Sequence, residues 1–163
     1  MNVTVAPAEI RLTRPDHPEV IALLAELDRY LGSLYPPEAN HILDVSALLA
    51  PEIDFFAAWQ DGRPVGCGAV RRMPGEPATG GRPYGEIKRM MTHPDARGQG
   101  LGGRMLSVLE STLRGRGVGL ALLETGRDQT EAVRLYERCG YRLRGPFGGY
   151  PDNGLSVFYE KSV

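Results

Sequence analysis

Four of the six residues at positions 98–103 are glycines, within the segment RGQGLGGR that spans residues 97–104. A run of strand-forming residues precedes the segment, and apolar side chains at helical spacing follow it through residues 100–114. Glycine lets backbone N–H groups approach a ligand closely, and the first turn of a helix leaves such groups unpaired. The segment therefore predicts a site for an anion such as phosphate or pyrophosphate, to which Arg97 and Arg104 can add charge-assisted hydrogen bonds.

Three other interpretations of this glycine segment depend on the residues next to it. The segment could be a turn that only lets a helix pack closely on a sheet. It lacks the Gly-Lys-Ser/Thr ending of a P-loop, which excludes that kind of nucleotide site. Gly98, Gly100 and Gly103 match the Gly-x-Gly-x-x-Gly pattern of nicotinamide dinucleotide enzymes, and Glu124 ends a later apolar run. That interpretation is the weaker one, because residues 93–97 separate the glycines from the strand that they should follow directly.

Apolar periodicity, capping residues and turn signals predict the element order β-α-α-β-β-β-α-β-α-β, which is typical of an α/β or α+β domain with a mixed sheet. Asp16 is expected to cap a first helix that ends near Gly32, and Asp44 to cap a short second helix. Asp128 and Glu131 form a capping box for the last helix. Strands are expected at residues 10–13, 53–59, 64–70, 84–92, 119–125 and 155–160.

Composition limits the classes of protein to which the chain can belong. With 163 residues, 42% of them hydrophobic, it can build one core, so we expect a single domain over residues 1–163. Its net charge of −1 gives no reason to expect a nucleic-acid or membrane partner. It has neither an apolar run of bilayer length nor the pattern of a secretory signal. Cys67 and Cys139 form no CxxC pair, which favours a cytoplasmic setting, and the oligomeric state stays open, a homodimer included.

Three motifs follow one another along residues 84–141. Thr92-His93-Pro94 fits a strand exit of a β-branched residue, any residue and proline, and residues 97–102 fit R/Q-x-x-G-x-G/A. Residues 129–141, QTEAVRLYERCGY, fit N-x-x-A-x-x-φ-Y-E-K/R-x-G-F, in which φ is apolar. In this order and spacing, the motifs resemble those of the GNAT superfamily of N-acetyltransferases, whose R/Q-x-x-G-x-G/A motif binds coenzyme A.

The resemblance implies a GNAT-like fold, a mixed, central twisted β-sheet flanked by helices. A splayed pair of parallel strands, here residues 84–92 and 119–125, would hold acetyl-CoA as co-substrate, with no metal. The implied activity is transfer of an acetyl group to a primary amine of a small molecule or amino-acid-like acceptor, by direct attack in a ternary complex. The residues implied to bind the co-substrate are Met90, Met91, Thr92, Arg97, Gly98, Gln99, Gly100, Leu101, Gly102, Gly103, Arg104 and Gln129, the last in place of the usual asparagine.

Two residues are implied to be catalytic. Tyr136 matches the family tyrosine that donates a hydrogen bond or a proton to the departing CoA thiolate, and the alternative is an aromatic side chain at the edge of the core. Glu86 lies six residues before Thr92, like the base glutamate of the histone-acetylating branch. A pairing of Glu86 with Lys88, on the same strand face at i+2, is the equally weighted alternative.

The remaining reactive side chains carry weaker predictions. Cys67 and Cys139 lie in apolar segments and are expected in the core, and His17, His41 and His93 do not have metal-ligand spacing. A non-catalytic acyl-CoA-binding sensor of the same fold stays an alternative. An acceptor carboxylate could be held by Arg71, Arg72 or Arg89, although a solvated surface is the favoured interpretation of these arginines, and the candidates for an acceptor pocket are Tyr30, Tyr35, His41 and Tyr150.

Overall fold

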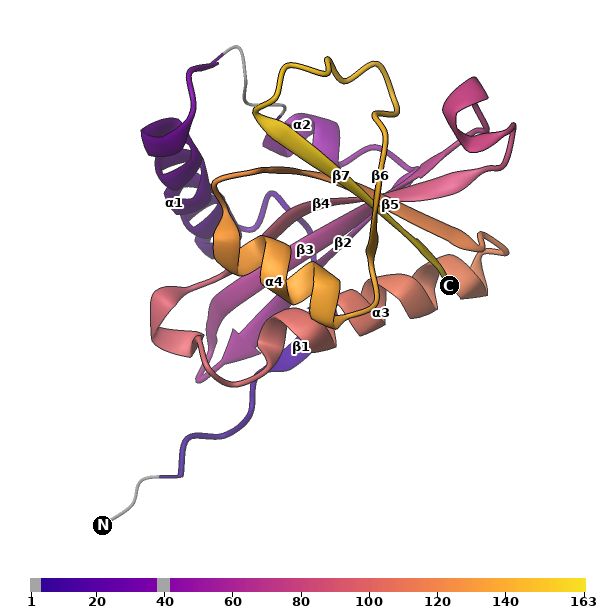
Figure 1. Cartoon of the computed structure of the whole chain (residues 1–163). Coiled ribbons are helices and arrows are strands. Elements are labelled where there is room, and N and C mark those ends of the chain that lie inside the picture. The colour runs from indigo at the N-terminus through magenta and orange to yellow at the C-terminus, as the bar shows by residue number, and fades with distance from the viewer. Residues whose placement is uncertain (1–3, 38–41) are drawn as a thin grey trace.

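The computed structural model describes residues 4–37 and 42–163, and in it seven strands form one mixed sheet in the order β1-β2-β3-β4-β5-β7-β6 (Figure 1). Strands β4 and β5 run parallel to each other, and the other neighbours are antiparallel. The prediction of a mixed sheet with one parallel pair is confirmed. The strands are β1 (Glu9–Leu12), β2 (Ile53–Gln60), β3 (Arg63–Met73), β4 (Tyr84–Thr92), β5 (Leu120–Gly126), β6 (Arg142–Arg144) and β7 (Ser156–Ser162).

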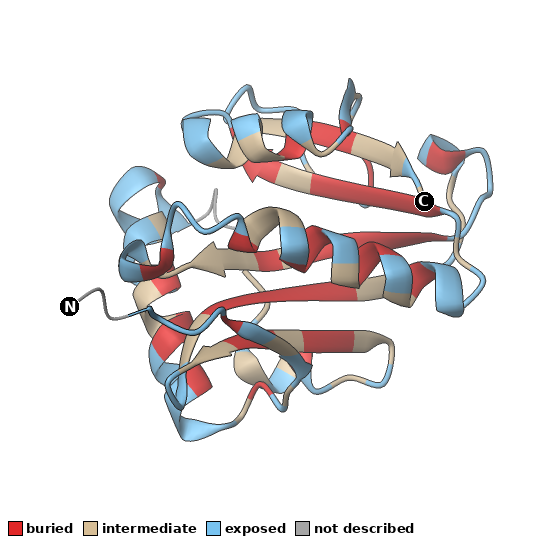
Figure 2. Ribbon diagram, turned by 90° about the horizontal axis from the view of Figure 1, so that it is seen from below, coloured by how far each residue is buried: buried red, intermediate tan, exposed pale blue. Residues whose placement is uncertain are grey.

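Helices cover both faces of the sheet because the strands alternate apolar side chains between the two faces. Helix α1 (Pro18–Leu34) and α2 (Val45–Leu48) pack on one face. Helix α3 (Leu101–Gly115) and α4 (Thr130–Arg138) pack on the other, and Figure 2 shows the buried residues of α3 turned toward the strands. None of these described helices has the length and apolarity needed to cross a bilayer.

The first helix begins and ends differently from its prediction. Its N-cap is His17, whose ring nitrogen accepts from the backbone N–H of Glu19 at 3.3 Å. Asp16 does not cap it, because the Asp16 carboxylate is engaged by Arg14 at 2.8 and 2.9 Å. Helix α1 also passes through Gly32 and ends at Leu34, where the extended backbone of Tyr35 follows.

The other caps divide between confirmed and wrong predictions. Asp44 caps α2 by accepting from the N–H of Ala47 at 2.8 Å, as predicted. The predicted capping box of Asp128 and Glu131 is wrong, since the N-cap of α4 is Gln129 and no side-chain cap bond forms there. Strand β6 was not predicted, because three residues with mostly exposed side chains give no period to detect.

A bulge in β4 lies just beyond the end of the parallel pair. The β3–β4 register shifts between Cys67 and Ala69, and on β4 Arg89 adopts a φ of 57° at this place. Strand β4 pairs with β5 only from Gly85 to Ile87. Beyond Ile87 the two parallel strands share no ladder in the described chain, and a space opens between them.

Candidate active site

The opening between β4 and β5 contains a cavity of about 100 Å³. Residues of β4, β5, α1 and α4 line it, together with side chains from the segments that follow α1 and precede β7. Four of the residues predicted for the site, Glu86, Met90, Gln129 and Tyr136, therefore lie around one cavity. A second hollow of about 360 Å³ adjoins it and shares Glu86, Lys88 and Tyr150 as lining residues.

Glu86 lies at the boundary between the two cavities and is only 5% exposed. Its carboxylate accepts a 2.5 Å hydrogen bond from the Tyr150 hydroxyl and lies 3.5 Å from the Lys88 ammonium. Lys88 in turn donates to the Tyr150 oxygen at 2.8 Å. Burial, and then the nearby Glu86 charge, raises the pKa of Tyr150 far above its ordinary value, so its hydroxyl keeps its proton and donates. The predicted pairing of Glu86 with Lys88 is therefore present in the structure. Glu86 nevertheless lines both cavities.

Tyr150 reaches Glu86 because its segment, residues 145–155, is anchored at several points. The Phe147 ring packs edge-on against the rings of Tyr84 and Tyr150, at 5.7 and 5.4 Å between ring centroids. The backbone N–H of Gly148 and the Tyr84 hydroxyl donate to the two carboxylate oxygens of Glu76, at 2.7 and 2.9 Å.

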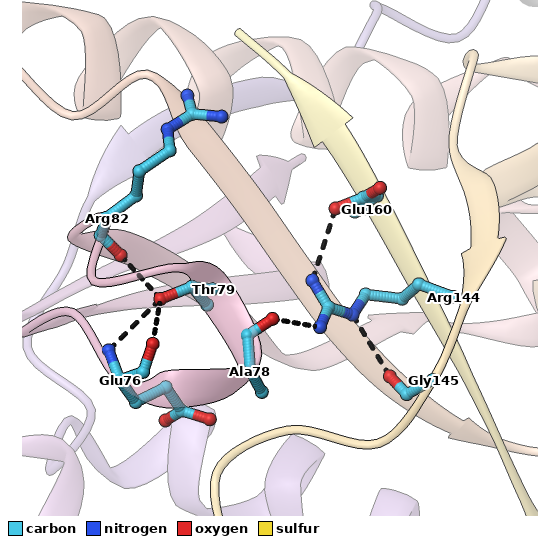
Figure 3. Close-up of polar contacts among 7 residues, drawn as sticks. All are labelled: Glu76, Ala78, Thr79, Arg82, Arg144, Gly145 and Glu160. Carbon is cyan, nitrogen blue, oxygen red and sulfur yellow. Dashed lines mark hydrogen bonds and ion pairs between the residues drawn. The ribbon is translucent and has the colours of Figure 1, made fainter.

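The start of this segment is fastened to the loop between β3 and β4. Figure 3 shows the Arg144 guanidinium between the carbonyl of Ala78, at 2.7 Å, and the carboxylate of Glu160, at 3.2 Å. Within the loop, the Thr79 hydroxyl bonds to both backbone groups of Glu76, each at 3.0 Å (Figure 3). The position of Tyr150 therefore depends on a loop that lies far from it in sequence.

Tyr136 lies on α4 with its ring in the core, next to the rings of Tyr141 and Tyr159 at centroid distances of 6.0 and 6.4 Å. Burial, with a smaller effect of Glu124, raises its pKa far above the ordinary value, so the phenol stays protonated. No described residue makes a hydrogen bond to its hydroxyl. Tyr136 is also one of the residues that line the cavity.

The glycine turn that precedes α3 exposes a series of backbone donors. Gly98 and Gly100 have φ values of 79° and 70°, in the left-handed region that side chains disfavour. Gly100 is the N-cap of the 15-residue helix α3, and no side chain caps it. Among the described residues, no acceptor pairs with the N–H groups of residues 98–103. Neighbouring donors of this kind at a helix N-terminus fit the oxygens of a phosphate or pyrophosphate.

Gly102, further along this turn, serves helix packing. A Cβ on Gly102 would lie 2.7 Å from the Leu135 side chain, so this glycine lets α3 approach α4 closely. Gly103 has more room, because a Cβ there would lie 3.8 Å from the Cys139 sulfur. Leu101 is buried, and only its backbone can face a ligand.

The polar side chains of the turn have protein partners. Arg97 is half exposed and lies 3.7 Å from the exposed carboxylate of Glu131. The Arg104 guanidinium donates to the carbonyl of Ala8 at 2.6 Å, and Gln99 accepts from Gln60 at 3.2 Å. Arg97 is therefore the guanidinium of this turn with the weakest competing contact.

Beyond the bulge, Met91 and Thr92 pair with Cys67 and Gly66 of β3, which leaves their other edge facing the opening. Cys67 is buried, and burial raises the pKa of its thiol to about 12, so the prediction of a core cysteine is confirmed. Cys139 also packs against the core, and neither cysteine forms a disulfide. The described residues hold no group of three or more His, Cys, Asp or Glu side chains with metal-binding geometry.

Three arginines predicted for a solvated surface have different environments. Arg89 is buried and pairs with Asp28 of α1, so the surface interpretation is wrong for it. Arg72 donates to the carbonyl of Pro51 at 2.7 Å. Arg71 is half-buried and lines the larger hollow.

The tyrosines predicted for an acceptor pocket differ in whether they line the cavity. Tyr35 and Tyr150 line the smaller cavity, whereas Tyr30 is 48% exposed and does not. His41 lies outside the described residues. Sequence reasoning missed Glu76 and Asp28, which act on the site through partners far away in the chain, and no local pattern could have found them.

Comparison with known proteins shows which family this chain resembles. The family model described as the Acetyltransferase (GNAT) family matches residues 20–141. The chain is 44% identical over 162 residues to an IAA acetyltransferase of Azospirillum brasilense, and the match covers 99% of each chain.

Solved structures agree with this match. One, from Klebsiella pneumoniae and assigned as an acyl-CoA N-acyltransferase, superposes with a TM-score of 0.77 at 35% identity, over 95% of this chain and 97% of that one. The fold is also that of an aminoglycoside 6′-N-acetyltransferase complexed with coenzyme A, with a TM-score of 0.68 at 18% identity over 94% and 96% of the two chains. Because the family model covers most of its length and a named acetyltransferase aligns along nearly all of it, the chain belongs to the GNAT family of N-acetyltransferases.

Proposed function

We propose that this N-acetyltransferase uses acetyl-CoA as its co-substrate and acetylates a primary amine of a small-molecule or amino-acid-like acceptor. The observation that carries the proposal is the combination of N–H donors at residues 98–103, which have no described acceptor, with a cavity that contains Glu86 and Tyr136. The neighbouring structure that was solved with coenzyme A supports the choice of co-substrate.

The co-substrate would be held mainly by backbone groups. In this proposal the N–H groups of residues 98–103 bind the pyrophosphate, and Arg97 adds a charge-assisted hydrogen bond. One terminal nitrogen of Arg104 already donates to Ala8, so a contribution from Arg104 would use its remaining donors. The open edge of β4 over residues 90–92 would pair with the pantetheine amides, and the Gln129 amide faces the same cavity.

The transfer would proceed by direct attack in a ternary complex. The amine nitrogen forms a bond to the acetyl carbon while the bond from that carbon to sulfur breaks. Glu86 accepts the proton that the ammonium must lose, directly or through a water, and Tyr150 and Lys88 hold its carboxylate in place. Tyr136 donates its hydroxyl hydrogen to the departing thiolate, as a hydrogen bond or as a proton. If the proton is transferred, one released from the amine nitrogen restores the phenol, and no described residue has to give up a bond to this hydroxyl.

The proposal also takes residues 1–163 as one acetyltransferase domain that acts in the cytoplasm. Two cysteines without a disulfide are consistent with a reducing compartment. A small-molecule acceptor is consistent with the site, which consists of a cavity of about 100 Å³ and a neighbouring hollow of about 360 Å³.

The experiment that tests the function measures thiol release from acetyl-CoA against a panel of amines, amino acids, polyamines and peptides. We expect release that depends on an amine and saturates with acetyl-CoA. Binding of acetyl-CoA with no release from any amine would instead indicate a non-catalytic sensor. A thermal shift with NAD and none with acetyl-CoA would indicate a dinucleotide enzyme.

A further inference from the structure

The larger hollow contains a positively charged side chain directly across from Glu86. In the β3–β4 ladder Arg71 is the register partner of Glu86, so both side chains project from the same face of the sheet. Arg71, Glu86 and Lys88 all line this hollow, which has a volume of about 360 Å³. The two polar ends of a small ligand could therefore meet groups of opposite charge here.

Arg71 has no partner of its own among the described residues. Its side chain makes no hydrogen bond or ion pair with any of them, and its Nε is buried without an acceptor. Arg72 and Arg89 also bury an unpaired Nε, but the rest of each guanidinium bonds to Pro51 or Asp28. Of the three, Arg71 is the guanidinium whose remaining donors are left for a ligand.

The carboxylates near Arg71 are already engaged. Glu86 accepts from Tyr150 and pairs with Lys88, so those two opposite charges offset each other. Both oxygens of Glu76 accept from neutral donors, the Tyr84 hydroxyl and the Gly148 N–H. Neither carboxylate therefore pairs with Arg71, and its half-buried guanidinium keeps donors that the carboxylate of a ligand can accept.

We propose that Arg71 binds a carboxylate of the acceptor, and that the acceptor is an amino acid. A guanidinium matches a carboxylate with two parallel hydrogen bonds. Side chains that lie directly opposite each other in a ladder begin about 5 Å apart, so an amine and a carboxylate on one carbon can reach Glu86 and Arg71 together. Met73, Ile42 and Leu43 offer apolar contacts to the rest of the molecule. This inference rests on the proposed function, since it names the substrate class for the same site.

The test compares each common L-amino acid with its own carboxamide, which keeps the amine and loses the negative charge. Thiol release from acetyl-CoA is the readout. We expect amino acids to be acetylated with a KM about tenfold or more below that of the matching carboxamides, as a lost hydrogen bond to a charged group implies. Arg71→Gln should raise the KM for the amino acid by a similar factor and leave that for the carboxamide unchanged, while Arg71→Lys should recover part of the loss.

Arg72→Gln is the matched control. It removes the next guanidinium on β3, which alternation directs to the other face, and should leave the KM for amino acids unchanged. Melting temperatures of the variants verify that each is folded. Equal use of amino acids and carboxamides, or an unchanged KM for the amino acid in Arg71→Gln, overturns the role of Arg71 while the proposed function stands. No thiol release from any amine, despite binding of acetyl-CoA, overturns both.

Discussion

The Tyr150 hydroxyl donates a 2.5 Å hydrogen bond to the carboxylate of Glu86, across 64 residues of sequence. This bond joins the segment before β7 to the strand at the centre of the site, next to the point where β4 and β5 part. Glu86 therefore owes its orientation to a residue that local sequence does not connect with it.

Tyr150→Phe removes the only hydroxyl in this pair and should lower kcat by about tenfold to a hundredfold, the value of a hydrogen bond to a charged group. The dissociation constant of acetyl-CoA should stay the same, because residues 98–103 do not depend on Tyr150. Steady-state kinetics together with calorimetric titration separates the two effects. An unchanged kcat would show that Glu86 needs no such support.

Gly100→Ala should weaken acetyl-CoA binding beyond its effect on stability. With a φ of 70° at Gly100, a Cβ costs about 1 to 2 kcal/mol and disturbs the N–H donors next to it. Gly117→Ala is the matched control, since Gly117 has a φ of 75° and equally open space but lies beyond the far end of α3. Both variants should lose similar stability to urea, and equal loss of acetyl-CoA affinity in both would contradict the assignment of the turn.

Tyr136→Phe should lower the catalytic rate, whereas Tyr141→Phe should lower the stability of the fold. The first removes a hydroxyl without a described partner, so it should lower kcat by about a hundredfold with little change in stability. The second removes the 3.0 Å bond from Tyr141 to buried Glu110, so it should cost about 1 to 3 kcal/mol of stability and leave kcat unchanged. Thiol release and thermal unfolding of the two variants check this, and a fully active Tyr136→Phe would remove Tyr136 from the chemistry.

The free energy of unfolding should fall at alkaline pH, in part because of Cys67. Burial raises the pKa of its thiol from 9.0 to about 12, so the folded state keeps a proton that the unfolded state loses. Its stabilising contribution is complete below about pH 9 and is lost as the pH rises toward 12. Urea unfolding at several alkaline pH values should show a shallower decline for Cys67→Ala, by at most about 1.4 kcal/mol per pH unit. Identical slopes would contradict the buried-thiol account.

Most of the fold could be predicted because its elements carry strong local signals. Residues 84–92 were predicted with the bounds that β4 has, and the Asp44 cap was predicted correctly. The errors arise where a side chain has a competing partner. Asp16 is a good cap by residue type, but Arg14 holds its carboxylate and His17 takes its place.

The candidate site was predictable only in its local parts. The glycine turn and Tyr136 belong to continuous motifs, and both could be found without knowledge of distant contacts. The unpartnered state of Arg71 could not be predicted, because it depends on what Glu86 and Glu76 bind instead. The sequence shows which charged residues are present. Which of them pair depends on the strand register and on the path of residues 145–155.

The measurement that tests this account most directly is thiol release by Glu86→Gln, with acetyl-CoA binding measured on the same preparation. Glutamine keeps the shape of the side chain and can still accept from Tyr150, but it cannot take up the proton of an ammonium. The account predicts a rate lower by about a hundredfold or more, with the dissociation constant of acetyl-CoA unchanged. A wild-type rate in Glu86→Gln at every pH tested would contradict it.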